Sequence, residues 1–279
     1  MRSEVVVKVE DSLQQEKQPY SPHFLMKCLT SEEWKIIVAA LQNLTEEAAF
    51  DVDSGGVRFR AMDPSHIALV DLCWDASGFE KFEFEPGKEK KEDRFAVRVE
   101  DFAKIIKRAD KNDSISISRS SSDALLIRMG ENREFEFHLL DKSAVAGSTP
   151  LPKLNLVSKF MINRAVFDSV LEDISVLTNH VRIRAEPAGT VTFSGNGDAG
   201  NAKIVFAKDE LAKFESPQES DAVYSLEYVQ KVLKPASSGS EFVEFSFASK
   251  MPMTASLNVG DPSKSRLKLT FFLAPRVSD

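Results

Sequence analysis

Two kinds of hydrophobic pattern alternate along the chain from about residue 24 onward. In one, apolar and polar residues alternate with a period of two, which predicts half-buried antiparallel strands. In the other, apolar residues recur at steps of three and four, which predicts short amphipathic helices. The strand pattern covers 57–62, 67–74, 79–84, 94–99, 114–119, 123–129, 133–140, 181–185, 190–194, 202–207, 241–248, 253–259 and 266–273, and the helix pattern covers 31–44, 100–109, 163–177 and 225–234.

Two stretches interrupt this alternation. Residues 1–22 are polar and rich in charge, so we predict a mobile N-terminal extension there, with an edge strand at Val5–Val7 as the alternative. Residues 141–156 contain two prolines and a glycine, which is typical of an extended connector between domains. The predicted organisation is therefore an extension at 1–22, a first domain at 23–140, a connector at 141–156 and a second domain at 157–279.

The order of the patterns repeats within the chain. Residues 31–72 align with residues 163–206, helix on helix. A second alignment, of the segments VEDFAKIIK and LEYVQKVLK, superposes two pairs of lysines, Lys104 on Lys231 and Lys107 on Lys234. Because both alignments preserve the order of the elements, we predict an α+β fold of two similar domains, each a duplicated strand–helix–three-strand unit.

Composition and charge narrow the class of protein. The chain has 279 residues, of which 42% are hydrophobic and 28% charged, a balance typical of a soluble globular protein. Its 36 basic and 43 acidic residues give a net charge of −7, which excludes a wholly basic coat for nucleic acid but allows a local basic face. No apolar run reaches the roughly 18 residues of a membrane helix, and the N-terminus does not resemble a signal peptide. The cysteines, Cys28 and Cys73, lie in apolar stretches and are predicted to be reduced core thiols.

No motif in the sequence indicates catalysis, a metal or a cofactor. The four histidines are scattered and form no pair at metal-ligand spacing, and no G-x-S-x-G nucleophile elbow occurs. The segment GNGDAGN at 195–201 lacks the Lys-Ser/Thr of a phosphate loop, so a hairpin turn is the better interpretation. The segment DVDSGG at 51–56 begins like a calcium loop, but its twelfth position is Met62 instead of glutamate, which favours a tight turn.

Several separated motifs, occurring in order, resemble one known family. Residues 56–72 read GVRFRAMDPSHIALVDL, and residues 267–277 read LKLTFFLAPRV. Both resemble the sliding-clamp family that includes proliferating cell nuclear antigen (PCNA). The helix FAKIIKRA, the loop FSGNGDAGNAKI at 193–204 and the segment MPM at 251–253 also fall where that family has counterparts. The resemblance covers about residues 24–277, and the LAPRV ending is more similar to archaeal members than to eukaryotic ones.

The resemblance implies an architecture and a function. Each subunit would carry helices on one face of antiparallel sheets, and three identical subunits would join head to tail into a closed ring. The ring would encircle duplex DNA without chemistry or cofactor. It would tether DNA polymerase, a flap endonuclease and DNA ligase, and a clamp-loader ATPase would place it on DNA. The expected compartment is the cytoplasm and nucleoid of an archaeal cell, or the nucleus of a eukaryotic one. The alternative is a clamp-fold subunit that forms the ring only with paralogous sister subunits.

The implied channel requires helices with one apolar and one basic face. Lys104, Lys107, Arg108 and Lys111 fall at i, i+3, i+4 and i+7, which places them on one stripe of a helix. Such side chains would contact phosphates without reading bases. A solvated helix face is the alternative, which the repeated lysine pair disfavours. The full predicted channel set is Lys35, Lys104, Lys107, Arg108, Lys111, Arg164, Lys231 and Lys234.

The third predicted helix departs from this expectation. Asp168, Glu172 and Asp173 make it acidic, whereas a channel helix is expected to be neutral or basic. Either these carboxylates turn away from DNA or the channel is weakly charged. An acidic exterior with a modestly basic lumen would also reconcile the net charge of −7 with a DNA partner.

The resemblance also implies a hydrophobic docking pocket beneath the connector, where clients insert a short motif with aromatic anchors. Methionine with isoleucine, leucine and proline around it suits such an aromatic plug. Core packing is the alternative for Met62 and Ile67, and a hydrogen-bonded structural histidine is the alternative for His66. The matching positions are Met62, His66, Ile67, Leu69, Val145, Leu151, Pro152, Pro252, Ala274, Pro275, Arg276 and Val277.

A ring requires an open strand edge at each end of the subunit. In the resembled family these edges map to residues 132–139 and 199–206 of this sequence. Long unprotected edges invite aggregation, and pairing them in a ring is a physical solution. The alternative is that both strands are internal to their sheets. The predicted interface residues are Phe135, Phe137, Lys203, Ile204 and Phe206.

Overall fold

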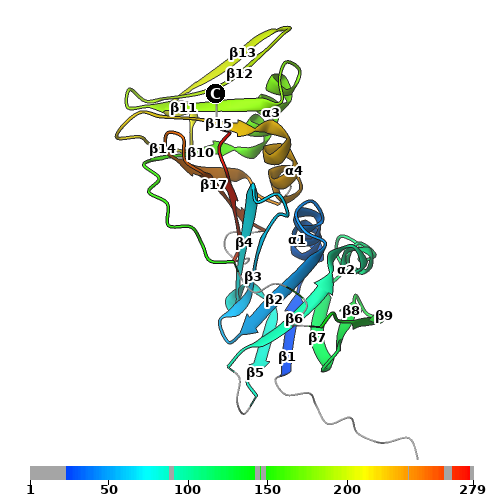
Figure 1. Cartoon of the computed structure of the whole chain (residues 1–279). Coiled ribbons are helices and arrows are strands. Elements are labelled where there is room, and N and C mark those ends of the chain that lie inside the picture. Colours follow the sequence, from blue (N-terminus) through cyan, green and yellow to red (C-terminus); the bar gives the residue numbers. More distant parts are fainter. Residues whose placement is uncertain are drawn as a thin grey trace, which may run out of the picture.

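The computed structural model describes residues 23–87, 91–141, 145, 149–237, 239–260 and 266–276. The predicted N-terminal extension at 1–22 lies outside the described residues. Figure 1 shows two lobes of similar construction, one for each half of the chain. The predicted α+β class is confirmed: the described elements are antiparallel strands and four α-helices.

Each half runs through the same order of elements. The first half contains β1 (His23–Cys28), α1 (Glu32–Gln42), β2 (Glu47–Asp53), β3 (Gly56–Met62), β4 (Ala68–Asp75), the 3-10 helix η1 (Ala76–Gly78), β5 (Lys81–Glu85), β6 (Asp93–Arg98), α2 (Val99–Ile106), β7 (Ile115–Ser121), β8 (Ala124–Met129) and β9 (Arg133–His138). The second half contains β10 (Ser158–Asn163), α3 (Arg164–Ser175), β11 (His180–Glu186), β12 (Thr190–Gly197), β13 (Gly200–Ala207), η2 (Lys208–Glu210), β14 (Lys213–Glu215), β15 (Ser220–Ser225), α4 (Leu226–Ser237), β16 (Phe242–Phe247), β17 (Met253–Val259) and β18 (Leu267–Leu273). The predicted duplication of the fold is therefore present element by element.

The strands form three antiparallel sheets, and one of them joins the two halves. Their orders are β5-β1-β7-β8-β9, β14-β10-β16-β17-β18-β4-β3-β2-β6 and β13-β12-β11-β15. The nine-stranded sheet combines five strands of the second half with four of the first. The join is the antiparallel pair β18–β4, which runs from Leu267 opposite Trp74 to Leu273 opposite Ala68.

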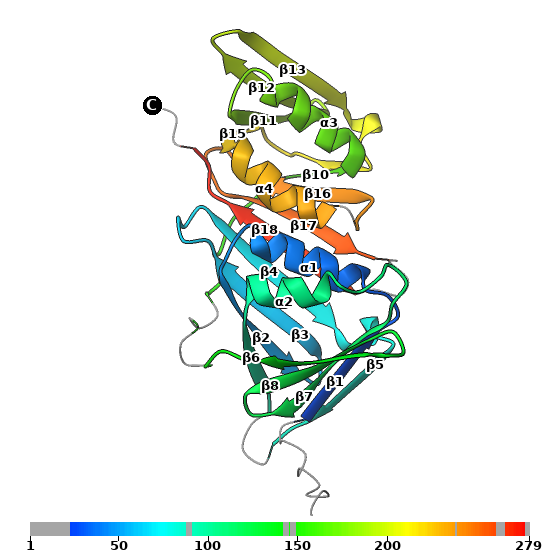
Figure 2. The same ribbon diagram turned by 90° about the vertical axis from the view of Figure 1, so that its right-hand side faces the viewer.

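All four helices lie on one face of these sheets. Figure 2 shows them side by side in the order α2, α1, α4, α3, with the sheets behind. Each helix buries one apolar stripe and leaves the other exposed, as the three-and-four spacing predicts. On α3, for example, Phe167, Val170, Leu171 and Ile174 are buried. The opposite stripes of the four helices form a single surface, which we call the helix face.

Aromatic clusters fill the space between helices and sheets in both halves. In the first half the ring of Trp34 lies 6.0 Å from Phe50, 5.5 Å from Trp74 and 5.8 Å from Phe102. In the second half, Phe160, Phe167, Phe193 and Phe245 form the corresponding cluster. Edge-to-face and offset aromatic pairs add to the free energy of area burial, so these clusters fix each helix on its sheet.

Two predictions about local structure were wrong. The second helix ends at Ile106, not at residue 109, because Arg108 and Ala109 donate to carbonyls three residues back and the chain tightens into turns. Cys73 is exposed on β4, since its neighbours Leu72 and Trp74 take the core side of the strand. Cys28 is buried as predicted, and burial raises the pKa of its thiol well above the usual value.

No helix in the described ranges is both long and apolar enough to cross a membrane.

The core cluster predicts a large loss of stability for Trp34→Ala. The Trp34 side chain is fully buried, so its truncation leaves a cavity and should lower the free energy of unfolding by about 3–5 kcal/mol. Denaturant unfolding followed by fluorescence and circular dichroism would measure the change. Val176→Ala is the control, because Val176 is 81% exposed and its truncation should change stability by no more than about 0.5 kcal/mol. A loss below about 1 kcal/mol for Trp34→Ala would contradict the described core.

Candidate functional site

Three of the predicted channel cations are already paired with carboxylates on the helix face. Lys104 on α2 lies 2.9 Å from Glu100 and 3.2 Å from Asp101, and hydrogen bonds to these two carboxylates raise its pKa. Two further pairs are Arg164 with Asp168 at 3.0 Å and Lys234 with Glu172 at 3.3 Å. The second of these links α4 to α3. Asp168 and Glu172 of the third helix thus neutralise neighbouring cations.

The other five predicted cations form no ion pair with a described residue. The ammonium group of Lys107 donates to Gln42 at 2.6 Å, and Lys231 is exposed on α4. Lys35 and Lys111 line one cavity of about 330 Å³ between α1 and α4, together with Pro235. The predicted stripe is not a purely helical one, because α2 ends at Ile106, and Arg108 and Lys111 follow it in turns. The structure nevertheless brings Lys111 to the same cavity as Lys35.

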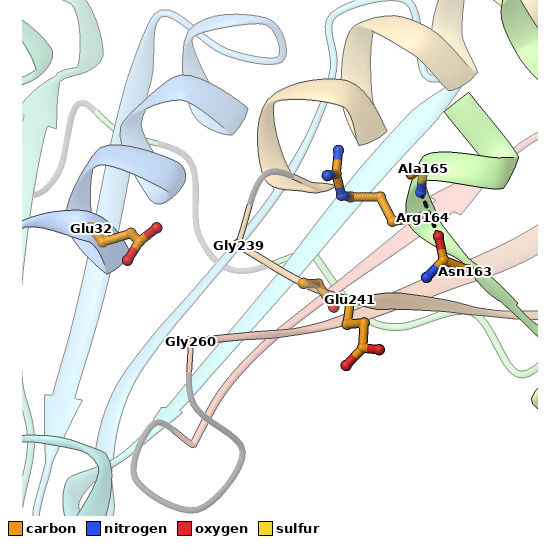
Figure 3. A pocket seen from close by; sticks show the side chains of 8 residues that line it. Glu32, Asn163, Arg164, Ala165, Gly239, Glu241 and Gly260 are labelled. Carbon is orange, nitrogen blue, oxygen red and sulfur yellow. Dashed lines mark hydrogen bonds between the residues drawn. The ribbon is translucent and has the colours of Figure 1, made fainter. Parts of the chain in front are cut away.

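Arg164 lines a second cavity, of about 390 Å³, beside the first turns of α1 and α3. Figure 3 shows Arg164 and Glu241 on one side and Glu32 across the cavity, with the Asn163 side chain accepting a hydrogen bond from the Ala165 N–H. The guanidinium group of Arg164 pairs with Asp168, and the carboxylates of Glu32 and Glu241 line the same cavity. The helix face as a whole is therefore close to neutral, with local positive charge where Lys35, Lys107, Lys111 and Lys231 lie.

A row of apolar side chains crosses the opposite, outer face of the nine-stranded sheet. Met62 pairs with Leu69, and Leu69 pairs with Phe272 on β18. On β4 the neighbours Ala68 and Val70 belong to the core beneath the helices, so Leu69 points the other way. Leu69 is nevertheless only 3% exposed. Sequence analysis missed Phe272, although the adjacent Phe271 and Phe272 in a strand must face opposite sides.

The loop after β3 is shaped by one buried carboxylate. Asp63 accepts hydrogen bonds from the backbone N–H groups of Ser65 at 3.0 Å, Ile67 at 2.8 Å and Ala68 at 2.6 Å. His66, inside this loop, is exposed and has a φ of 58°, in the left-handed region. Its side chain makes no hydrogen bond to a described residue, so the alternative of a bonded structural histidine finds no support, and its place in the docking pocket stays a prediction. Asp63 is a residue that sequence analysis overlooked. Its signal was the Asx pattern Asp-Pro-Ser, which is typical of a turn.

The C-terminal tail and the connector lie beside this loop and this row. The Ala274 N–H donates to the Ile67 carbonyl at 2.9 Å, and Pro252 precedes Met253, which pairs with Leu273. Arg60 reaches the connector, donating to the Thr149 carbonyl at 3.1 Å.

Among the remaining predicted pocket residues, Leu151 and Pro152 are exposed, Val145 and Pro275 are half-buried, and Arg276 is exposed. Figure 1 shows residues 149–156 of the connector on the side of the sheets away from the helices. We call the surface made by Met62, Ile67, Leu69, Phe272, Ala274 and Pro275 the outer apolar surface. Val277 lies outside the described residues.

β9 and β13 are edge strands whose counterparts in the repeat pair with each other. In the repeated order, β9 of the first half corresponds to β18 of the second half, and β4 of the first half corresponds to β13 of the second. Inside the chain β18 pairs with β4, whereas β9 and β13 are the outermost strands of the five-stranded and four-stranded sheets. The alternative that both strands are internal is therefore wrong.

The side chains of these two edges alternate as predicted. Phe137 is buried against Phe102 and Phe206 packs against Phe193, with ring centroids 5.6 Å and 5.9 Å apart. Phe135 and Ile204 are partly buried against the same core. Lys203 and Val205 point outward, and Val205 is 47% exposed. Sequence analysis missed Val205, whose signal was an apolar residue on the polar side of an alternating strand.

This architecture defines a class of protein. A duplicated domain with a layer of helices on one side, antiparallel sheets on the other and an open strand edge at each end is the DNA-clamp fold. The described residues contain no group of three or more histidine, cysteine, aspartate or glutamate side chains that could hold a metal ion.

The chain belongs to the proliferating cell nuclear antigen (PCNA) family. The family's N-terminal domain matches residues 26–142, and its C-terminal domain matches residues 151–276. Among curated proteins, the DNA polymerase sliding clamp of Cenarchaeum symbiosum is 37% identical over 257 residues, covering 91% of this chain and 99% of that protein. The DNA polymerase sliding clamp of Nitrosopumilus maritimus is 37% identical over 256 residues, covering 91% of this chain and 98% of its own length. The predicted resemblance is thus confirmed.

Solved structures have the same fold. A PCNA of A. fulgidus, solved with the C-terminal region of FEN-1 bound, superposes with a TM-score of 0.83 at 21% identity and covers 92% of this chain and 99% of its own. A PCNA from Thermococcus kodakaraensis superposes with a TM-score of 0.82 at 22% identity, covering 91% of this chain and all of its own. At these identities the likeness concerns the fold.

Proposed function

We propose that three copies of this chain close head to tail into a ring that encircles duplex DNA and tethers replication and repair enzymes. The observation that carries this proposal is the relation between the joined and the open strand edges. If β9 of one copy pairs with β13 of the next, the contact repeats between copies the pairing that β18 and β4 make within one chain. Each contact uses two different edges, so it is heterologous and generates a closed ring when the rotation permits.

The helix face would line the channel of this ring. Its four unpaired lysines, Lys35, Lys107, Lys111 and Lys231, would contact phosphates from several helices without reading the base sequence. Arg108, in the turn after α2, would add a fifth cation. Lys104, Arg164 and Lys234 would contribute less, because carboxylates neutralise them. Encirclement holds the protein on DNA by topology, so a nearly neutral channel that permits sliding suits the function better than a strongly basic one.

The outer apolar surface would dock clients. Its methionine, leucine and phenylalanine side chains suit an aromatic anchor, and the neighbouring tail and connector offer backbone groups to an extended peptide. A fold relative has been solved with the C-terminal region of FEN-1 bound, which supports a flap endonuclease as one client. DNA polymerase, DNA ligase and the clamp-loader ATPase are the further partners that we propose. The clamp itself would perform no chemistry.

We also propose the domain limits 23–140 and 157–279, with 141–156 as connector and 1–22 as extension. A position in the cytoplasm and nucleoid of an archaeal cell fits the archaeal relatives. A ring built with paralogous sister subunits is the second candidate architecture, because two chemically different edges can also pair between different chains.

The open edges predict the mass of the protein in solution. Light scattering after size exclusion should give three times 31.1 kDa, or 93.3 kDa. Val205→Lys places a charge at the β13 edge and should shift the mass toward 31.1 kDa. Val176 is a more exposed valine just after α3, so Val176→Lys should leave the trimer intact. A wild-type mass of 31.1 kDa across a concentration series would favour the mixed ring.

The channel assignment predicts the salt dependence of DNA binding. Each lost phosphate contact should lower the magnitude of the slope of log K against log salt by about 0.9. Lys107→Ala with Lys231→Ala should therefore lower it by about 1.8 for each copy of the chain whose two lysines contact phosphate. Binding to duplex DNA over a salt series would measure the slope. Lys104→Ala should change it less, because two carboxylates already neutralise Lys104. The control is Lys81→Ala with Lys213→Ala, because these lysines lie on the edge strands β5 and β14 and not on a helix. An equal change of the salt slope in the control would contradict the channel assignment.

The docking assignment predicts loss of client stimulation when charge enters the outer apolar surface. Ile67→Glu with Pro275→Glu should abolish polymerase processivity on primed templates, since a buried unpaired carboxylate opposes apolar docking. Leu29→Glu is the control, because Leu29 is 59% exposed outside this surface and should retain full stimulation. Unaltered processivity in the double variant, with the ring intact, would refute this docking site.

A further inference from the structure

The stretch from the end of β15 into the first turn of α4 makes hydrogen bonds to three segments that flank the outer apolar surface. The Val223 carbonyl accepts a hydrogen bond from the Arg276 N–H at 2.7 Å. The Tyr224 hydroxyl donates to the Met251 carbonyl at 2.9 Å. The Tyr228 hydroxyl donates to the Asp63 carboxylate at 3.2 Å, across the junction of the two halves. Figure 1 shows β15 and α4 beside the end of the red strand β18.

The two tyrosines hold the two loops that flank this surface. Met251 precedes Pro252, a predicted docking residue from the second half. Asp63 begins the loop that carries Ile67, a predicted docking residue from the first half. The two loops come from opposite ends of the sequence, and both are tied to hydroxyls four residues apart.

Both loops also need such ties, because each is locally strained. The two described residues other than glycine with positive φ are His66 at 58° and Lys250 at 56°. His66 lies in the loop tied by Tyr228, and Lys250 precedes the carbonyl bound by Tyr224. Backbone conformations of this kind persist when surrounding contacts fix them, and they concentrate at ligand-binding sites.

Both tyrosine hydroxyls are well placed to hold these loops by hydrogen bonds. Tyr224 is fully buried, and burial raises its pKa, so the hydroxyl stays protonated and keeps donating. Tyr228 adds a fourth donor to the Asp63 carboxylate, which already accepts three backbone N–H groups. A hydrogen bond to a charged acceptor contributes more than one between neutral groups.

We propose that Tyr224 and Tyr228 are positioning residues for client docking, which hold the two loops in the binding-competent arrangement without contacting the client. This inference rests on the proposed docking function. A client that meets preformed loops does not lose affinity to loop ordering, so removal of either hydroxyl should weaken binding.

The test is titration of a synthetic peptide from the C-terminal region of a flap endonuclease against the full-length ring. Tyr224→Phe and Tyr228→Phe should each weaken binding about three- to tenfold, because each loses one hydrogen bond and keeps the aromatic ring. Ser240→Ala is the matched control. It removes a hydroxyl that donates to the Phe242 carbonyl at 2.8 Å, beyond the far end of α4, and should bind within about twofold of wild type.

Amide hydrogen exchange separates positioning from a general loss of stability. Tyr228→Phe should speed exchange at Ser65, Ile67 and Ala68, and leave Met251 unchanged. Tyr224→Phe should do the reverse, speeding exchange at Lys250 and Met251, so each variant serves as the control for the other. The mass of the ring and its retention on DNA should stay at wild-type values in both variants.

Peptide affinity and exchange rates equal to wild type in both variants would overturn the inference. If the wild-type ring does not bind the peptide, the docking proposal fails instead. In that case the exchange measurements still decide whether the hydroxyls hold the loops, and unchanged exchange would overturn the inference on its own.

Discussion

The structure depends on the antiparallel pairing of β18 with β4. This backbone ladder joins the halves of the chain into a nine-stranded sheet. It places Phe272 beside Leu69 on the outer face and the tail beside Ile67, so a surface arises that neither half could make alone. It also sets α4 beside α1 on the inner face. The same ladder explains the open ends: a duplicated fold that uses one copy of each edge internally leaves the other copies, β9 and β13, exposed.

Electrostatics on the inner face follows from this packing of helices. The sequence shows an excess of acid, with a net charge of −7, and a third helix rich in carboxylates. The structure places Asp168 against Arg164 of the same helix and Glu172 against Lys234 of the neighbouring helix. Exposed pairs of this kind contribute little to stability. Their effect is to lower the positive potential of the helix face, so that only a few of its cations keep their full charge.

Most of the fold was predictable from the sequence, because periodicity and order are local and the duplication doubled the signal. All four predicted helices and all predicted strands are present. The pattern missed the strands β1, β2, β10, β14 and β15, and β2 shows a physical reason. In β2 the run Glu-Ala-Ala-Phe has low strand propensity, and the strand forms because β3 and β6 pair with it on both sides. For the candidate site, the sequence predicted which positions belong to it but not the contacts that those residues make. Phe272, Val205 and Asp63 were missed because their roles depend on what pairs or turns beside them, and the end of α2 depends on turns that periodicity does not reveal.

The two open edges differ in chemistry as well as in position. The outward residues of β9 include Glu134, Glu136 and His138, whereas those of β13 include Lys203 and Val205. A ring closed by pairing these unlike edges has a rotation axis but no two-fold axis across it, so its two flat sides are different. Such a ring has a direction on DNA. Once threaded, it could not turn over without opening, and under the proposed function every client surface would point toward the same end of the duplex.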